Sequence, residues 1–166
     1  LATGQDTGET IVEAADGGTW SPDGTALYYT ELDESHRPFR VRRHQLGTPQ
    51  SADEIVYEEA DAGFFVGVGE TLSRQFITID VHDHQTSEVW LIDRAGGSPR
   101  LVSKRQAERE YDVEERGGTL YLLTNADGAE DFKIVTAPAA TPDAEHWVDL
   151  VPHTPGVLIL DVIVLA

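Results

Sequence analysis

The sequence contains one serine whose neighbours suggest nucleophilic catalysis, Ser98 in Gly96-Gly97-Ser98-Pro99-Arg100. A hydrolase nucleophile usually occupies the centre of Gly-x-Ser-x-Gly, on a strand-to-helix turn that exposes its hydroxyl. Here Arg100 replaces the second glycine, and Pro99 lacks the backbone N–H that an oxyanion hole would use. The flanking residues are typical of a hairpin loop. We therefore expect a structural role for Ser98, and no catalytic residue in this chain.

A second candidate cluster is His82-Asp83-His84, whose two imidazoles share one strand face with Asp80. Imidazole and carboxylate groups arranged in this way can bind zinc. A catalytic zinc site also needs a third protein ligand and a shaped cavity, which the sequence does not show. We therefore predict a solvated loop with no metal and no cofactor.

Basic residues at every second position form a third pattern, Arg40, Arg42 and His44. In a chain of formal net charge −18, carboxylates are abundant, so these residues are expected to form a salt-bridged strand surface. The same net charge would repel phosphate backbones and attract cationic ligands. Nucleic acid is therefore not an expected partner, and the simplest interpretation of the charge is a solvated acidic surface.

Length and composition exclude further classes. With 166 residues, 40% of them hydrophobic, the chain is long enough for one domain with its own core. Its longest apolar run, 157–165 interrupted by Asp161, is far shorter than the ~20 residues of a membrane-spanning helix. No secretion signal opens the sequence, so a cytoplasmic location is expected. Cysteine is absent, and the first residue is not Met, which favours a piece excised from a longer protein.

Short β-prone segments separated by turn-forming residues position all of these groups. The clearest example is a hairpin in which Leu120–Leu123 and Phe132–Val135 flank a turn containing Asn125 and Asp127. The second strands of successive units centre near Tyr28, Ile77 and Tyr121, which gives a repeat of roughly 45 residues with four strands in each unit. No stretch shows sustained helical spacing.

This repeat predicts an all-β fold, a partial β-propeller of about three four-stranded antiparallel blades plus the first strand of a fourth. A β-sandwich is the alternative, but a sandwich has no reason to repeat its strand order at this period. The predicted ranges are 1–18 for the end of a preceding blade and its connector, 19–61, 62–106 and 107–154 for three blades, and 155–166 for the first strand of the next.

The apolar run 157–165 is expected to be a buried strand at one truncated end. A propeller buries the flat faces of its blades by closing a ring, and a piece of three blades leaves two such faces open. Without the rest of its blade, this strand would offer unpaired backbone groups. A homo-oligomer joined through 157–165 is therefore expected.

Propeller geometry also predicts which loops carry function. In each blade, the link between the second and third strands lies on the same face as the link to the next blade. Residues 31–37, 82–87 and 125–131 should therefore share one face with the connectors, which are expected near 13–18, 60–63, 105–110 and 152–156. A ligand or partner is expected on this face.

Several motifs in order resemble the propeller of the prolyl oligopeptidase family. They are Trp20-Ser-Pro-Asp-Gly24 with Tyr28-Tyr-Thr30, Arg37-Pro-Phe-Arg-Val-Arg-Arg-His44 with Leu46-Gly-Thr48, Thr86-Ser-Glu-Val-Trp-Leu91, and Thr124-Asn-Ala-Asp-Gly-Ala-Glu-Asp-Phe-Lys133. The last, followed by Trp147-Val-Asp-Leu-Val-Pro-His153, is more similar to the oligopeptidase B branch than to prolyl oligopeptidase itself. The likeness runs over nearly the whole chain.

The resemblance implies a seven-bladed propeller that caps an α/β-hydrolase domain with a Ser-Asp-His triad, in enzymes that cleave short peptides. Oligopeptidase B cuts after Arg or Lys. In the family, the stretch matching Ile79 to Gln85 faces the active site and carries an arginine and a cysteine in prolyl oligopeptidases. Here Asp80, His82, Asp83 and His84 stand in that stretch, which suits a cationic substrate.

The sequence therefore predicts a non-catalytic propeller segment of an oligopeptidase B-like serine peptidase. Its expected partners are its own C-terminal α/β-hydrolase domain, absent here, and short cationic peptides. The expected substrate-facing residues are Asp80, His82, Asp83, His84, Asn125 and Asp127. The alternative is a protein-interaction propeller scaffold with no enzyme attached, and the sequence that follows Ala166 in the parent would separate the two.

Overall fold

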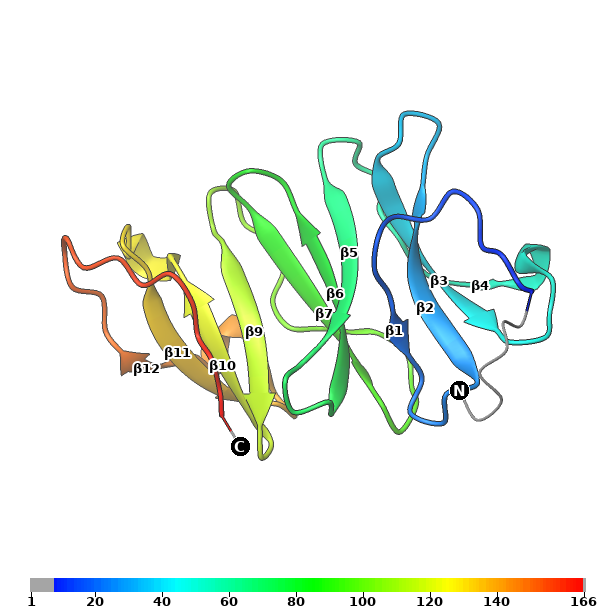
Figure 1. The fold of residues 1–166 in the computed structure, drawn as a ribbon. Helices are drawn as coiled ribbons and strands as arrows, with labels where there is room; N and C mark the ends of the chain where they lie inside the picture. The colour runs from blue at the N-terminus through cyan, green and yellow to red at the C-terminus, as the bar shows by residue number, and fades with distance from the viewer. Residues whose placement is uncertain (1–7, 166) are drawn as a thin grey trace.

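The computed structural model describes residues 8–165, which form three antiparallel sheets of four strands each (Figure 1). The first sheet contains β1 (Thr19–Trp20), β2 (Ala26–Leu32), β3 (Pro38–Gln45) and β4 (Glu54–Glu58). The second contains β5 (Phe65–Glu70), β6 (Phe76–His82), β7 (Ser87–Asp93) and β8 (Arg100–Leu101). The third contains β9 (Tyr111–Arg116), β10 (Thr119–Thr124), β11 (Lys133–Pro138) and β12 (Val148–Val151). We call these sheets blades 1, 2 and 3.

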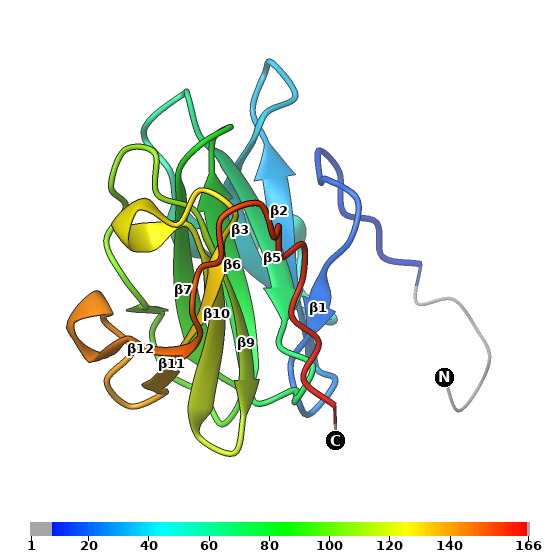
Figure 2. The ribbon, with the colours of Figure 1, turned by 90° about the vertical axis from the view of Figure 1, so that its left-hand side faces the viewer.

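In every blade the strands lie side by side in chain order. Figure 2 shows the first strands β1, β5 and β9 toward one side and the outermost strand β12 toward the other. The predicted three blades of four antiparallel strands are confirmed. The strands of each blade fall within 19–61, 62–106 and 107–154, although these ranges stay a prediction as domain boundaries. Short 3-10 helices, η1 (Gln50–Ala52), η2 (Ala126–Gly128) and η3 (Ala144–His146), interrupt the loops, and no helix in the described part of the chain could span a membrane.

Turn chemistry sets the register of blade 3. Arg116 of β9 pairs with Thr119 of β10, which leaves Gly117 and Gly118 as a two-residue turn. Both glycines have positive φ, +61° and +82°, as a type I′ hairpin turn requires. The hairpin between β10 and β11 forms as the sequence predicts, and Asp127 adopts a positive φ of +58° within its turn.

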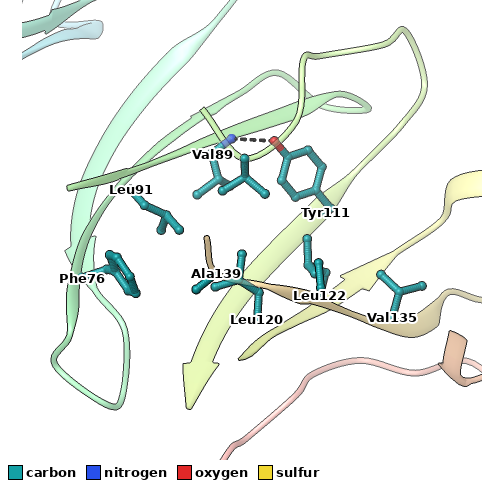
Figure 3. Packing of buried hydrophobic residues seen from close by; sticks show 10 residues of the cluster. Phe76, Val89, Leu91, Tyr111, Leu120, Leu122, Val135 and Ala139 are labelled. Carbon is teal, nitrogen blue, oxygen red and sulfur yellow. Dashed lines mark hydrogen bonds between the residues drawn. The ribbon is translucent and has the colours of Figure 1, made fainter. Parts of the chain in front are cut away.

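Blade 2, the middle blade, buries both of its faces because it has a neighbouring blade on each side. In β6, Ile77, Ile79 and Val81 pack toward blade 1, in a core that also contains Val41 and Val66. On the opposite face of β6, Phe76 packs toward blade 3 with residues of that blade. This second core contains Val89, Leu91, Val102, Tyr111, Leu120, Leu122 and Val135 (Figure 3). The middle blade therefore has few polar side chains between its neighbours.

Hydrogen bonds join the loops that were predicted to share a face, which lies at the top of Figure 1. The Arg37 guanidinium donates to the carbonyls of Asp61 and Phe64, so the 31–37 loop contacts the connector to blade 2. The Glu108 amide donates to Thr86 Oγ1, which links the 82–87 loop to the next connector. The Gly156 amide donates to Asp131, which links the 125–131 loop to the connector after blade 3. The predicted sharing of one face is confirmed.

The prediction that residues 157–165 form a buried strand is wrong. These residues form no strand, and Leu160 is 81% exposed. A strand needs a neighbour to pair with, and the segment instead holds to blade 3 by single contacts such as the Ile159 amide donating to the Asp131 carbonyl at 3.0 Å. Ile159, Val162 and Val164 are half-buried along it. Residues 1–7 of the predicted 1–18 connector and Ala166 lie outside the described residues.

Candidate functional site

A cleft of about 480 Å³ opens between the upper ends of blades 2 and 3, on the face that carries the connectors. Blade 2 contributes Asp80, His82 and Asp83, and blade 3 contributes Tyr111 and Asp112. Leu158, Ile159 and Leu160 of the C-terminal segment form another wall. The cleft thus contains three of the six residues that the sequence singled out.

Asp80 is held on β6, half-buried, opposite Gly67 of β5. A Cβ atom at Gly67 would lie 4.0 Å from the Asp80 Cβ, so the glycine leaves room beside the carboxylate. Thr78 Oγ1 donates a weak hydrogen bond to Asp80 Oδ2 at 3.3 Å. Burial, followed by the nearby charge of Asp112, raises the pKa of Asp80 to about 6.

Asp112 enters the cleft from β9, the first strand of blade 3. Its pKa is also raised, first by burial and then by the charge of Asp161. Among the described residues, neither Asp80 nor Asp112 has a cationic side chain within ion-pair distance. The cleft therefore concentrates negative charge without an ion pair, and the His82 ring only partly offsets the raised pKa of the two carboxylates. A cation entering the cleft would lower the electrostatic energy of both.

The other predicted loop residues divide by what their side chains already do. His82 is exposed at the end of β6 and its ring lies 6.2 Å from that of Phe65. Asp83 Oδ1 accepts hydrogen bonds from the amides of Gln85 and Thr86, at 2.8 and 2.7 Å. These bonds, the one from Gln85 first, hold the pKa of Asp83 below its usual range. Asp83 therefore shapes the turn rather than offering a free carboxylate.

Three of the predicted residues lie outside the cleft. His84 is exposed and does not line it. Asn125 clamps the preceding connector, because its Oδ1 accepts from the Glu110 amide at 2.8 Å and its Nδ2 donates to the Glu108 carbonyl at 3.0 Å. Asp127 pairs with Lys133 at 2.9 Å and lines a different cavity. The structure thus separates these residues from Asp80.

Metal binding and serine chemistry find little support in the geometry. Within residues 8–165, no group of three or more His, Asp or Glu side chains is placed to hold a metal ion. Ser98 lies in the loop that joins β7 to β8, at the opposite end of β7 from the cleft. The predicted salt-bridged strand surface is confirmed for Arg40 and Arg42, which both pair with Glu31. It is wrong for His44, which is buried with its Nδ1 2.8 Å from Asp53 Oδ1.

Sequence reasoning missed Asp112 and the Leu158–Leu160 wall. No motif marks Asp112, which directly follows Tyr111 at the start of β9. Its register opposite Leu123 and its approach to Asp80 depend on how two blades pack. A search for carboxylates near the start of each first strand could have identified it.

Comparisons with known proteins agree with this architecture. The family model described as "Prolyl oligopeptidase, N-terminal beta-propeller domain" matches residues 1–166. Dipeptidyl aminopeptidase BI of Pseudoxanthomonas mexicana is 37% identical over 161 residues, which cover 96% of this chain and 22% of that protein. Protease 2 of Moraxella lacunata is 36% identical over 121 residues, which cover 72% of this chain and 17% of that protein.

Two solved structures resemble the chain in three dimensions. Oligopeptidase B from Trypanosoma brucei, in a closed form with covalently bound antipain, matches with a TM-score of 0.88 at 32% identity, over 94% of this chain and 22% of that one. Oligopeptidase B from Leishmania major matches with a TM-score of 0.80 at 31% identity, over 89% of this chain and 22% of that one. The chain therefore spans about a fifth of the length of these relatives. The resemblance seen in the motifs is confirmed, and the chain belongs to the prolyl oligopeptidase family as part of its N-terminal β-propeller domain.

Proposed function

We propose that this chain is the non-catalytic propeller segment of an oligopeptidase B-like serine peptidase, whose parent hydrolyses short peptides after Arg or Lys. In that parent, the segment restricts access and helps to position substrate for a C-terminal α/β-hydrolase domain. Family membership and the likeness to two oligopeptidase B structures support the assignment. The acidic loops suit a basic substrate.

The observation that carries the substrate preference is the pair of unneutralised carboxylates, Asp80 and Asp112, in one cleft. A cleft of one charge sign concentrates ligands of the opposite sign, and low-dielectric walls strengthen the effect. The cleft also has apolar walls from Leu158 and Ile159, against which the methylene stem of a Lys or Arg side chain could pack. An arginyl or lysyl peptide therefore matches both its charge and its surface.

The test uses the full-length parent with both carboxylates neutralised, Asp80→Asn with Asp112→Asn. We expect KM for arginyl and lysyl peptides to rise about three- to tenfold at low salt, because each lost charge removes a fraction of a kcal/mol to about 1 kcal/mol of attraction. Added salt should shrink the difference, and KM for neutral peptides should change little. Glu54→Gln, an exposed carboxylate at the far end of blade 1, is the matched control.

An unchanged KM for basic peptides at low salt would leave the cleft as ordinary acidic surface. Asp83 is kept intact in this experiment because its carboxylate holds the turn through the amides of Gln85 and Thr86. Its replacement would change loop structure and charge together.

The isolated chain is expected to show no turnover of arginyl or lysyl peptides. Its candidate nucleophile, Ser98, lies in an exposed loop away from the cleft, in a motif that lacks the second glycine. The measurement is hydrolysis by purified residues 1–166, together with labelling by a fluorophosphonate probe. Stoichiometric labelling of Ser98 would overturn the non-catalytic assignment.

A further inference from the structure

A second cavity, of about 440 Å³, lies beside the outer strands β11 and β12 of blade 3. It shares no residue with the acidic cleft. Its walls include Arg109, Ala126, Asp127, Lys133, Val135 and Trp147. With Asp149, the lining has two cations and two carboxylates around an indole ring and small apolar side chains, so it is less acidic than the chain as a whole.

Arg109 is the unusual member of this cavity, because it is a buried cation with few partners. It is 8% exposed, and its guanidinium donates from Nη2 to Ser103 Oγ at 2.9 Å and to the Lys104 carbonyl. Nε is buried without any hydrogen-bond partner. Among the described residues, no carboxylate lies within ion-pair distance of it. Buried charges in proteins are normally paired, so this guanidinium calls for an anionic neighbour.

The carboxylates that line the cavity are already engaged by the other cation. Lys133 Nζ lies 2.9 Å from Asp127 Oδ2 and 2.9 Å from Asp149 Oδ1. This triplet carries one positive and two negative charges, and the ammonium sits between the carboxylates. Arg109 therefore supplies a positive charge that is not matched at hydrogen-bonding distance.

The apolar walls lie close to the guanidinium. The Arg109 Cζ is 5.4 Å from the centre of the Trp147 ring and 5.8 Å from that of Tyr111. The Trp147 indole is held in place, because its Nε1 donates to the Pro142 carbonyl at 2.9 Å and its ring contacts Tyr111 edge-on at 5.5 Å. Val135 and Ala126 extend the apolar surface. A ligand here would meet a fixed charge and a rigid aromatic wall together.

We propose that this cavity binds a small carboxylate with an apolar body, the carboxylate accepting a hydrogen bond from Arg109 Nη1 and the apolar body packing on Trp147 and Val135. Nη2 already donates to Ser103 and to the Lys104 carbonyl, and Nε is enclosed by protein, so Nη1 is the nitrogen left for a ligand. The volume is within the range that accommodates small-molecule ligands. The formal net charge of −18 opposes the approach of any anion, but screening limits this effect to about 8 Å at physiological ionic strength.

The test compares two ligands of the same shape, N-acetylleucine and its uncharged analogue N-acetylleucinamide, added to the 166-residue chain. The observable is the position of the Trp147 indole N–H signal in ¹H–¹⁵N correlation spectra. We expect a saturable shift with N-acetylleucine, with Kd on the order of millimolar, and at least about tenfold weaker binding of the amide. Equal binding of both compounds, or no saturable shift with the acid up to about 50 mM, would overturn the proposal.

Two variants locate the site. Arg109→Lys keeps the charge but removes the Nη1 donor, and we expect affinity for N-acetylleucine to fall about tenfold. Because Arg109 is buried and its replacement could disturb folding, Ala144→Phe fills the cavity from a half-buried position in η3 and should abolish binding while the remaining spectrum is kept. Arg74→Lys, at an arginine whose side chain is 77% exposed, is the matched control and should bind as the unaltered chain does. Unchanged affinity in Ala144→Phe would contradict the assigned cavity.

Discussion

The two junctions between blades have similar apolar interiors but differ at the face that carries the connectors. Between blades 1 and 2, Arg105 contacts two buried carboxylates, Glu59 and Glu88, and stacks 4.2 Å from the Phe64 ring. Between blades 2 and 3, Asp80 and Asp112 have no such cation among the described residues. One junction is thus closed by a cation that bridges two carboxylates, and the other has carboxylates without an ion pair.

This difference separates a structural use of charge from a binding use. Burial alone would raise the pKa of Glu59, but hydrogen bonds from Arg105 and from the Asp61 amide outweigh burial and hold that pKa below its usual range. For Asp80, burial and the charge of Asp112 act in the same direction and raise the pKa to about 6. The ionised form of Glu59, at the first junction, therefore favours folding, whereas the ionised form of Asp80, at the second, opposes it. Residues kept at a cost in stability are candidates for function.

The largest expected effect on stability comes from Arg105→Ala, which removes the cation of the junction between blades 1 and 2. Glu59 and Glu88 are each 7% exposed, so the substitution would leave two buried carboxylates without their cation. Loss of one partner of a buried ion pair typically costs about 3–5 kcal/mol. We expect a fall of that size in the free energy of unfolding, measured by urea denaturation at pH 7. Arg74→Ala, whose pair with Glu70 is exposed, is the control and should cost at most about 0.5 kcal/mol.

A loss of less than about 1 kcal/mol in Arg105→Ala would mean that the first junction does not depend on its charges. The contrast between the two junctions would then have no energetic basis.

The apolar part of the second junction is tested by Tyr111→Phe. The Tyr111 hydroxyl accepts from the Val89 amide at 2.9 Å (Figure 3). It also donates to the Ser103 carbonyl at 2.6 Å, so it joins two parts of blade 2 to β9. Phenylalanine keeps the ring in the core and leaves these buried backbone groups without a partner. We expect a loss of about 2 kcal/mol in the free energy of unfolding. An unchanged midpoint of denaturation would show that water or another group replaces the hydroxyl.

The motifs predicted the fold well because propeller blades are built from local signals. The glycine pair 117–118, the apolar runs of β10 and β11 and the repeat of roughly 45 residues can all be read from neighbouring positions. The candidate site depends on contacts between blades. Nothing in the sequence places Asp112 of β9 near Asp80 of β6, or shows that the Asn125 side chain is used to clamp a connector.

The strand predicted at 157–165 is wrong for the same reason, because strand formation also depends on contacts with other parts of the molecule. Alternating apolar residues favour an extended backbone, and the segment is extended. A strand is defined by its partner, however, and the described part of the chain offers none at that position.

The junction between blades 2 and 3 is tested by Asp80→Asn. We expect this substitution to stabilise the fold, whereas Arg105→Ala and Tyr111→Phe destabilise it, and we expect a smaller change. The pKa of Asp80 is near 6 when folded, above the ordinary value of 3.8, so the folded state binds more protons between those two values. Stability should therefore fall as pH rises from about 4 to 6, and the cost should be fully present above pH 6. Asparagine removes the charge and can still accept from Thr78. We expect Asp80→Asn to raise the free energy of unfolding by about 1–2 kcal/mol at pH 7.5.

The pH dependence provides the control for this prediction. At pH 3.5 the Asp80 carboxyl is protonated in the folded state and mostly protonated in the unfolded state, whose pKa is near 3.8, so the gain from Asp80→Asn should nearly vanish there. Denaturation curves of both proteins at pH 3.5 and 7.5 measure this difference. An equal gain at both pH values would assign the effect to packing rather than to charge.

The smallest expected effect on stability is in the segment 157–165, which follows blade 3. Val157, Leu158, Leu160, Ile163 and Leu165 are each more than half exposed, and no strand pairs with their backbone in the described chain. Apolar side chains beside unpaired amides and carbonyls favour association with a second copy. We therefore expect a dimer or larger assembly at micromolar concentration by sedimentation velocity.

Leu160→Lys should shift the chain to monomer and change the free energy of unfolding by less than about 0.5 kcal/mol, since Leu160 is 81% exposed. Thr141→Lys, which adds the same single positive charge at an exposed position after β11, should leave the assembly unchanged. A chain that sediments as a monomer without any substitution would show that the contacts of 157–165 with blade 3 satisfy this segment, and the two junctions would then be the only surfaces in residues 8–165 where blades depend on a neighbour.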